Sequence, residues 1–504
     1  MKKLVLAVLG AALVACASTP GVPGQPASIV FINAQVADGS GAPLRAASVR
    51  IKGDRIAAIG DFQPAAGEQV IDARGLVLAP GFIDIHNHSD DGLKDDPLAT
   101  SQIAQGITSM VLGLDGGSPW PVGPWLDALR QDPVAPNVAM TVGHATVREE
   151  VMKQDYRRVA RPEEVAEMAR LVERAMREGA VGISSGVEYY VASYSDTREL
   201  IEVAKAAAKH GGFYMTHIRD EADKAFAALD ESIAIGEHAP IGVQHSHIKL
   251  ATVNTWNQAQ DYIRVIEAAR ARGVDYFADC YPYDAWSSNL KVTVPDKQYE
   301  NPESVARAIY DLGGPGRLTI TEFEANRSYE GKTLEQLANE AGLTPVDMFI
   351  RIIREEDASG TSPSVIGQSM VDPDIRAFYQ QPWVMVSSDG GIGSRHPRGA
   401  GAFPRVLGVL VREKQWLTLA EAVRKMTSLP AQRLGWKDRG VLREGAYADL
   451  VLFNPDTVKD RSTFKEPFLP PVGIEQVFVN GVAVWKTDKP TGQRPGRVLT
   501  GKDR

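Results

Sequence analysis

Four histidines and one aspartate stand where they could hold a metal ion together. Each lies at or just after the end of a short apolar run: His86, His88, His217, His247 and Asp389. Neutral imidazole and carboxylate are ordinary zinc ligands, and a catalytic zinc keeps one position open for water. These residues predict a catalytic metal centre that holds Zn²⁺, as one ion or two, with another divalent metal as the alternative.

The spacing within the set supports this interpretation. His86 and His88 are two residues apart, so on an extended segment both project to the same side and can chelate one ion. A single histidine is more often a structural side chain. We assign that structural role to His245, which precedes His247 by two residues and is expected to face the opposite side of the strand. Five ligand-type residues that each end an apolar run favour a metal site.

A metal site built from these residues requires a fold that brings the ends of several strands together. Between residues 81 and 434, apolar runs of strand length alternate with helical stretches such as 162–178 and 196–210, the pattern of repeated βα units. The expected strands are 81–86, 108–113, 138–144, 180–185, 213–217, 241–247, 274–279 and 383–387. Eight strands predict an α/β fold, a (β/α)₈ TIM barrel, in which the carboxyl ends of the strands meet at one mouth.

The two chain ends have a different pattern. Residues 27–80 and 436–504 consist of short alternating runs broken by Gly and Asp, which is typical of strands and hairpins. We expect them to pair into one small β-sandwich beside a catalytic barrel domain of residues 81–435. A long stretch, about 286–345, fits no barrel strand and is interpreted as an insertion over the barrel mouth.

The first 26 residues resemble a lipoprotein-type signal and tether. Lys2 and Lys3 precede an apolar run, 4–14, that is too short to span a bilayer. Residues 13–16 resemble a bacterial lipoprotein box, in which Cys16 becomes the lipidated first residue and the Pro- and Gly-rich 19–25 the tether. We expect export to the periplasm, with membrane contact only through lipid at Cys16. A plain secretory signal is the alternative.

Composition limits the other partners. The formal net charge is -8, with both signs interspersed, so no basic stripe is available to neutralise a phosphate backbone and nucleic acid is not expected as a partner. Cys280 is the only thiol besides Cys16, so lipidation of Cys16 would leave no intramolecular disulfide. The oligomeric state is not predicted.

An ordered set of motifs spans nearly the whole chain. It comprises APGFIDIHNHSD (79–90), GITSMVLG (106–113), GHATVREEVM (143–152), GAVGISSGVEYY (179–190), THIRDE (216–221), HSHIK (245–249), DCYPYDA (279–285), SSDGGIGSRHPRGAGAFPRVL (387–407), and GAYADLVLFNP with VNG (479–481). The set resembles the amidohydrolase superfamily and, within it, the D-aminoacylase or N-acyl-D-amino-acid deacylase family. The resemblance implies a barrel with a β-sandwich, zinc, and hydrolysis of N-acyl-D-amino acids.

One position departs from that family. Its members carry a zinc-ligating cysteine in the turn after the second strand, where this chain has Gly113-Leu114-Asp115-Gly116. Asp115 is therefore the predicted replacement ligand. Aspartate is a harder ligand than a thiolate, which leaves the identity of the metal open. Glu188, near the end of the fourth strand, is the rival ligand.

The expected mechanism uses water as the nucleophile. Zinc lowers the pKa of bound water to about 7, and Asp389 can take a proton from the water and pass it to the leaving amine. His88 or His144 could help the metal to stabilise the oxyanion. Arg398 can form a bidentate pair with the substrate carboxylate. Hydrogen bonds to the substrate are expected from Lys249, Tyr283 and Ser288, where Lys249 and Tyr283 match family motifs.

Two other functions stay open. A dipeptidase that releases a C-terminal D-residue, or a cyclic-amide hydrolase, would share this fold and metal site, because selectivity lies in the loops. A non-catalytic surface lipoprotein that serves as a binding module is disfavoured by the intact set of histidines and Asp389.

Overall fold

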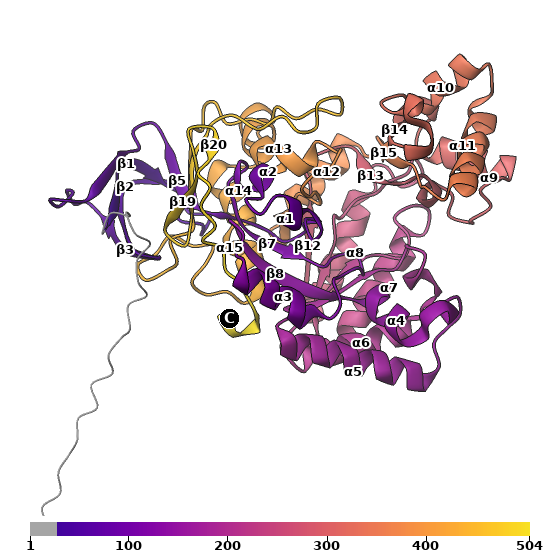
Figure 1. The fold of residues 1–504 in the computed structure, drawn as a ribbon, viewed down its shortest axis with the longest axis horizontal. Coiled ribbons are helices and arrows are strands. Elements are labelled where there is room, and N and C mark those ends of the chain that lie inside the picture. Colours follow the sequence, from indigo (N-terminus) through magenta and orange to yellow (C-terminus); the bar gives the residue numbers. More distant parts are fainter. Residues whose placement is uncertain (1–27) are drawn as a thin grey trace, which may run out of the picture.

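The computed structural model describes residues 28–504. They form a parallel barrel with a β-rich part at one end and a helical unit at the other (Figure 1). The predicted signal, tether and lipidation site at Cys16 lie outside the described residues.

Each of the eight expected barrel strands is confirmed. They are β6 (Phe82–Asp84), β7 (Ile107–Leu112), β8 (Asn137–Gly143), β9 (Gly182–Gly186), β10 (Phe213–His217), β11 (Gly242–His245), β12 (Tyr276–Cys280) and β16 (Val384–Val386). Their order is β16-β12-β11-β10-β9-β8-β7-β6 and every pair is parallel. A bridge between Asn87 and Gly390 joins the two edges, and the Asp389 N–H donates to the His86 carbonyl at 2.9 Å. The closure thus lies beside three predicted site residues.

Helices surround the barrel strands. They are α1 (Gly92–Asp95), α2 (Thr100–Ile103), α3 (Val122–Gln131), α4 (His144–Met152), α5 (Pro162–Glu178), α6 (Thr197–Ala208), α7 (Ala225–His238), α8 (Ala259–Ala271), α12 (Asp372–Tyr379), α13 (Arg398–Arg405), α14 (Leu419–Met426) and α15 (Ser428–Leu434). In α5, Val165, Met168 and Val172 recur at helical spacing and are buried, so one face packs on the barrel. A π-helical stretch, Val406–Glu413, continues α13.

Both chain ends contribute to one further sheet, as predicted. Its strands are β1 (Ile29–Val36), β2 (Arg45–Lys52), β3 (Arg55–Gly60), β4 (Gln69–Asp72), β5 (Val77–Pro80), β17 (Leu450–Phe453), β18 (Ile474–Val479), β19 (Val482–Lys486) and β20 (Lys489–Pro490). The order is β20-β19-β18-β17-β5-β1-β2-β3, with β4 also paired to β1. Phe31 and Val49 share a hydrophobic cluster with Leu450 and Phe478, so residues from both ends make its core.

A helical unit interrupts the barrel between β12 and β16. It contains β13 (Trp286–Asn289), α9 (Pro302–Asp311), β14 (Leu318–Glu322), α10 (Leu334–Ala341), α11 (Pro345–Ser359) and β15 (Ser364–Gly367). The unit extends to residue 367, beyond the expected end near 345. The reason is that β15 returns after α11 and pairs antiparallel with both β13 and β14. Residue 345 is the first residue of α11, capped by the Thr344 side chain.

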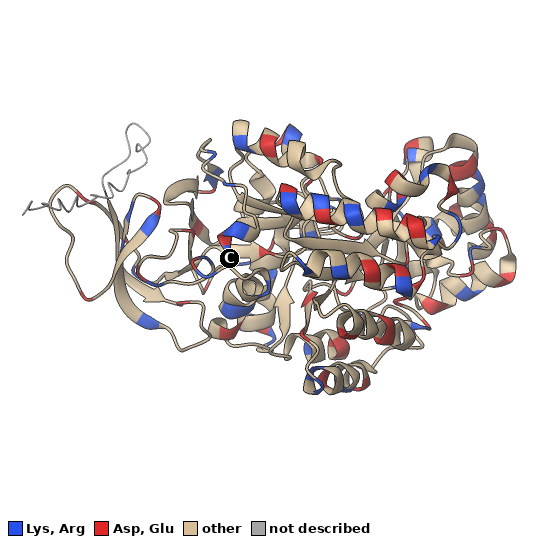
Figure 2. Ribbon diagram, turned by 90° about the horizontal axis from the view of Figure 1, so that it is seen from below, with Lys and Arg blue, Asp and Glu red and all other residues tan. Residues whose placement is uncertain are grey.

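Charged residues of both signs are interspersed along the helices in the view of Figure 2. Within residues 28–504, no helix combines the length and the apolar character that a membrane crossing requires.

Candidate metal centre and active site

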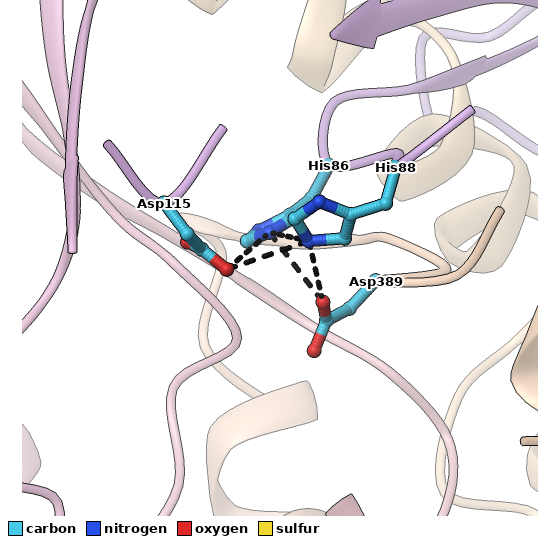
Figure 3. Close-up of side chains that lie close together, drawn as sticks. All are labelled: His86, His88, Asp115 and Asp389. Carbon is cyan, nitrogen blue, oxygen red and sulfur yellow. Dashed lines mark hydrogen bonds and ion pairs between the residues drawn. The ribbon is translucent and has the colours of Figure 1, made fainter. Parts of the chain in front are cut away.

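The predicted ligands converge because each follows the carboxyl end of a barrel strand. His86 and His88 follow β6, Asp115 follows β7 and Asp389 follows β16, while His217 ends β10. In a TIM barrel these ends meet at one mouth, and Figure 3 shows His86, His88, Asp115 and Asp389 pointing toward one another.

Three of the candidate ligands have left-handed backbone conformations. The φ angle is 51° at Asp115, 37° at His247 and 47° at Asp389. Such a conformation costs a non-glycine residue about 1–3 kcal/mol and clusters at functional sites. The turns after β7, β11 and β16 therefore hold strained residues at the predicted metal site.

One group of donors consists of His86, His88, Asp115 and Asp389 (Figure 3). The Nε2 atoms of His86 and His88 lie 3.2 Å apart, and His88 Nε2 lies 3.2 Å from Asp389 Oδ1. Asp115 Oδ2 lies 3.5 Å from His86 Nε2 and 3.4 Å from His88 Nε2. Nitrogen and carboxylate donors aimed at one point fit a zinc ion.

A second group consists of Asp115, His217 and His247. His217 Nδ1 lies 3.0 Å from His247 Nε2, and His247 Nε2 lies 3.7 Å from Asp115 Oδ2. Asp115 belongs to both groups, and its Oδ1 is buried without a hydrogen-bond partner among the described residues. Asp115 is therefore the donor residue that the two groups share.

Glu188 contacts Nε2 of His217, the ring nitrogen opposite the one that faces His247. Its Oε2 is 2.7 Å from His217 Nε2, and with Glu221 the two form a third donor group. Glu188 does not belong to the group around His86. The geometry favours Asp115 over Glu188 as the ligand shared with His86 and His88.

Two carboxylates outside the predicted set hold the histidines. Asp279 Oδ1 lies 3.3 Å from His86 Nδ1 and accepts the His247 backbone N–H at 2.9 Å. Glu221 Oε1 lies 3.1 Å from His247 Nδ1. Carboxylates beside metal-binding imidazoles fix ring orientation and tautomer. Neither residue is among the predicted site residues, although Asp279 ends the seventh predicted strand and Glu221 stands four residues after His217.

The charges of the site shift one another's pKa values. Burial lowers the pKa of His88, but hydrogen bonds to Asp115 and Asp389 outweigh burial and raise it to about 9. Burial raises the pKa of Asp389, but the Arg398 guanidinium and nearby histidines hold it well below its usual range. Metal ligands must be deprotonated, so a bound divalent cation would take over the charge balance that protonated histidines otherwise supply.

A cavity of about 350 Å³ opens beside the donors. Among the predicted substrate-binding residues, Lys249, Ser288 and Arg398 line it. Arg398 Nη1 lies 2.6 Å from Asp389 Oδ2, and its buried Nε has no hydrogen-bond partner among the described residues. Tyr189, which was not predicted, also lines the cavity, with its hydroxyl 3.3 Å from His217 Nδ1.

His144 and Tyr283 are not brought to this cavity, contrary to the prediction. His144 is fully buried, with Nε2 2.8 Å from Glu199 Oε1. The Tyr283 hydroxyl donates to the Pro397 carbonyl at 3.4 Å, and the Arg405 guanidinium lies 4.6 Å from its ring centroid. Both side chains are therefore engaged in packing away from the metal donors.

Comparisons with known proteins agree with this fold. Residues 69–485 match the model of the Amidohydrolase family. D-aminoacylase from Alcaligenes xylosoxydans xylosoxydans is 38% identical, with 94% of this chain and 98% of the relative covered. A crystal structure of D-aminoacylase, 36% identical, superposes with a TM-score of 0.84 over 94% of this chain and 99% of the other.

A second solved structure shows a related enzyme with metal. N-acyl-D-glutamate deacylase from Bordetella bronchiseptica, complexed with zinc and a phosphonate mimic of the tetrahedral intermediate, is 33% identical. Its TM-score is 0.85 over 94% of this chain and 100% of that one. The fold and donor set define a metal-dependent hydrolase of the amidohydrolase type. This chain belongs to the Amidohydrolase family.

Proposed function

We propose that this protein hydrolyses the amide bond of N-acyl-D-amino acids and releases a carboxylate and a free D-amino acid. The observation that carries the proposal is the meeting of two donor groups, joined by Asp115, with Arg398 in one cavity. The D configuration is supported by relatives such as D-aminoacylase, 38% identical over nearly the whole chain.

The residues present fit a zinc centre. His86, His88 and Asp389 would hold one ion, His217 and His247 a second, with Asp115 between them. Bound zinc lowers the pKa of coordinated water to about 7 and polarises the scissile carbonyl. Because these donors fall into two groups, we propose that the site binds two ions.

Asp389 is the proposed proton carrier. Its Oδ1 faces His86 and His88, while Arg398 holds Oδ2. The carboxylate takes a proton from the attacking water and delivers it to the amide nitrogen, which then leaves as an amine. Arg398 lowers the pKa of this carboxylate, which therefore stays ionised, and the ion pair fixes its orientation.

Arg398 also binds the substrate carboxylate in this proposal. A guanidinium has five N–H donors in a planar fork, so Arg398, which lines the cavity, can contact Asp389 and still have donors for a second carboxylate. Ser288 can donate a further hydrogen bond. Lys249 contributes less directly, because its ammonium lies 2.6 Å from Glu221 Oε2.

The part of the cavity that would receive the side chain of the substrate favours a neutral, apolar D-residue. The apolar residues that line the cavity include Ala251, Trp286, Ala308 and Leu312, which we call the apolar wall. The cations among the described lining residues are Lys249 and Arg398, and each is already near a carboxylate. A second carboxylate on the substrate would have to be buried without a cation of its own, which is costly.

Steady-state kinetics with zinc-loaded protein test the proposal. N-acetyl-D-leucine should be hydrolysed faster than N-acetyl-D-glutamate, and Asp389→Asn should lower kcat by roughly 10²- to 10⁴-fold, the usual contribution of a general base. A metal-replete protein that cleaves no N-acyl-D-amino acid would contradict the proposal and favour a binding module.

We also propose that the protein is exported and anchored to a bacterial membrane by a lipid attached to Cys16. The support is the charged, apolar and small-residue order of residues 1–26. In a Gram-negative host, labelled palmitate should be incorporated into the wild type and not into Cys16→Ser. Equal labelling of both would overturn this assignment.

A further inference from the structure

A second cavity lies directly outside the metal-site cavity. It has a volume of about 860 Å³ and shares Glu188, Tyr189, Val292 and Pro295 with the inner one. We call it the outer cleft; it runs between residues 187–193 of the barrel and residues 289–299 of the helical unit. The two cavities are therefore neighbours across these four residues, and we call this boundary the passage.

The outer cleft meets the metal centre at His217, whereas Arg398 meets it at Asp389. Glu188 and Tyr189, at the passage, contact His217 at 2.7 and 3.3 Å. Arg398 instead contacts Asp389, which belongs to the other donor group. A substrate whose carboxylate is held by Arg398 and whose amide lies at the donors therefore directs its acyl group toward the passage.

Several apolar side chains line the outer cleft at the passage and beyond it. At the passage, Val292 is half-buried and Pro295 is exposed. Tyr299 lines the cleft beyond them. The exposed fraction of Tyr190 is 46%, and its ring packs edge-on against Tyr156 with centroids 5.8 Å apart. These side chains offer a hydrophobic surface to an extended ligand.

Charged groups of the outer cleft mostly have protein partners. Arg219 forms two hydrogen bonds to Glu231, at 2.7 and 2.8 Å. Lys291 Nζ lies 2.7 Å from Asp357 Oδ1, and Lys297 donates to Ser193 Oγ at 3.0 Å. Paired charges gain little from an ionic ligand, so the remaining apolar surface determines what the cleft favours.

We propose that the outer cleft binds the acyl arm of the substrate, and that this arm is an apolar chain longer than acetyl. The inference rests on the proposed function, since it assumes that the inner cavity holds an N-acyl-D-amino acid. The amino-acid half is held by Arg398 and the apolar wall, and the acyl half is the part that can leave through the passage. The inner cavity then selects the amino acid, and the outer cleft selects the acyl group.

The test compares kcat/KM for N-octanoyl-D-leucine and N-acetyl-D-leucine. Wild type should prefer the octanoyl substrate. Ala227→Trp places a large ring in the cleft from an exposed position on α7, and Tyr299→Ala removes apolar wall. Each variant should lower the octanoyl-to-acetyl ratio by roughly three- to tenfold, the size of one or two lost aromatic contacts, while N-acetyl-D-leucine hydrolysis is retained.

Tyr310→Ala is the matched control, because Tyr310 is an exposed tyrosine of the helical unit that does not line the cleft. The ratio should be unchanged in this variant. Hydrolysis of N-acetyl-D-leucine with the same ratio in wild type, Ala227→Trp and Tyr299→Ala would overturn the acyl-arm assignment alone. Absence of hydrolysis of both substrates by wild type would overturn the proposed function as well.

Discussion

Arg398 Nη1 lies 2.6 Å from Asp389 Oδ2, and both side chains are buried where the metal donors meet the cavity. The pair links the group that would move protons to the group that would bind the substrate carboxylate. It also explains why the pKa of Asp389 stays below its usual range despite burial.

Arg398→Ala should lower kcat/KM for N-acetyl-D-leucine by roughly 10- to 100-fold, because a hydrogen bond to a charged group contributes about 1.5–3 kcal/mol. Metal content, measured by atomic spectrometry, should be retained. Arg395→Ala is the control, since the Arg395 side chain is 42% exposed and lies 3.5 Å from Glu322. Unchanged kinetics in Arg398→Ala would remove this residue from the site.

Asp115→Ala should lose bound metal, whereas Glu188→Ala should keep most of it, because Asp115 belongs to both ligand groups that contain predicted histidine pairs. Asp115→Cys should raise affinity for Zn²⁺ and Cd²⁺ relative to Mn²⁺, since thiolates favour softer metals. Metal titrations monitored by competition with a chelating dye measure both effects. Full metal stoichiometry in Asp115→Ala would contradict Asp115 as a ligand, and loss of metal in Glu188→Ala would then identify Glu188 as the ligand.

Asn480→Ala should destabilise the contact between the β-rich end and the barrel. Asn480 Nδ2 donates to Asn137 Oδ1 of β8 at 2.8 Å, and Asn480 Oδ1 accepts from Arg439 at 2.9 Å. Leaving these buried groups unpaired costs about 1–3 kcal/mol, which lowers the Tm while kcat stays near that of wild type. Asn339→Ala, at an exposed position of α10, is the control. An equal Tm for both variants would argue against this contact.

Lys425 gives a pH-dependent prediction. Burial lowers the pKa of its ammonium from 10.5 to about 7, although the Glu421 carboxylate opposes the shift. Above pH 7 the unfolded chain therefore binds more protons at this residue than the folded chain, so this residue's contribution to stability rises with pH up to its unfolded pKa. The Tm of wild type relative to Lys425→Met should increase between pH 7 and about 9. Parallel Tm profiles would contradict the shift.

The barrel and its ligand residues could be predicted because the signal is local. Apolar runs that end in His86, His217 or Asp389 reveal both a strand and the residue at its carboxyl end. The fold then brings these ends together whatever their separation in the chain.

Side-chain direction beyond a strand end could not be predicted in the same way. Tyr283 follows β12 by three residues, and its direction depends on contacts with Pro397 and Arg405, more than 100 residues away. His144 begins α4, where Glu199 of a later helix fixes its ring. The end of the helical unit depends likewise on the pairing of β15 with β13, which local periodicity does not encode.

The most direct test of the central claim is the rate of hydrolysis of paired enantiomers by the zinc-loaded protein. N-acetyl-D-leucine should be cleaved about a hundredfold faster than N-acetyl-L-leucine, because the wrong configuration misplaces the amide relative to the metal donors and Asp389. Faster cleavage of the L enantiomer would contradict this claim.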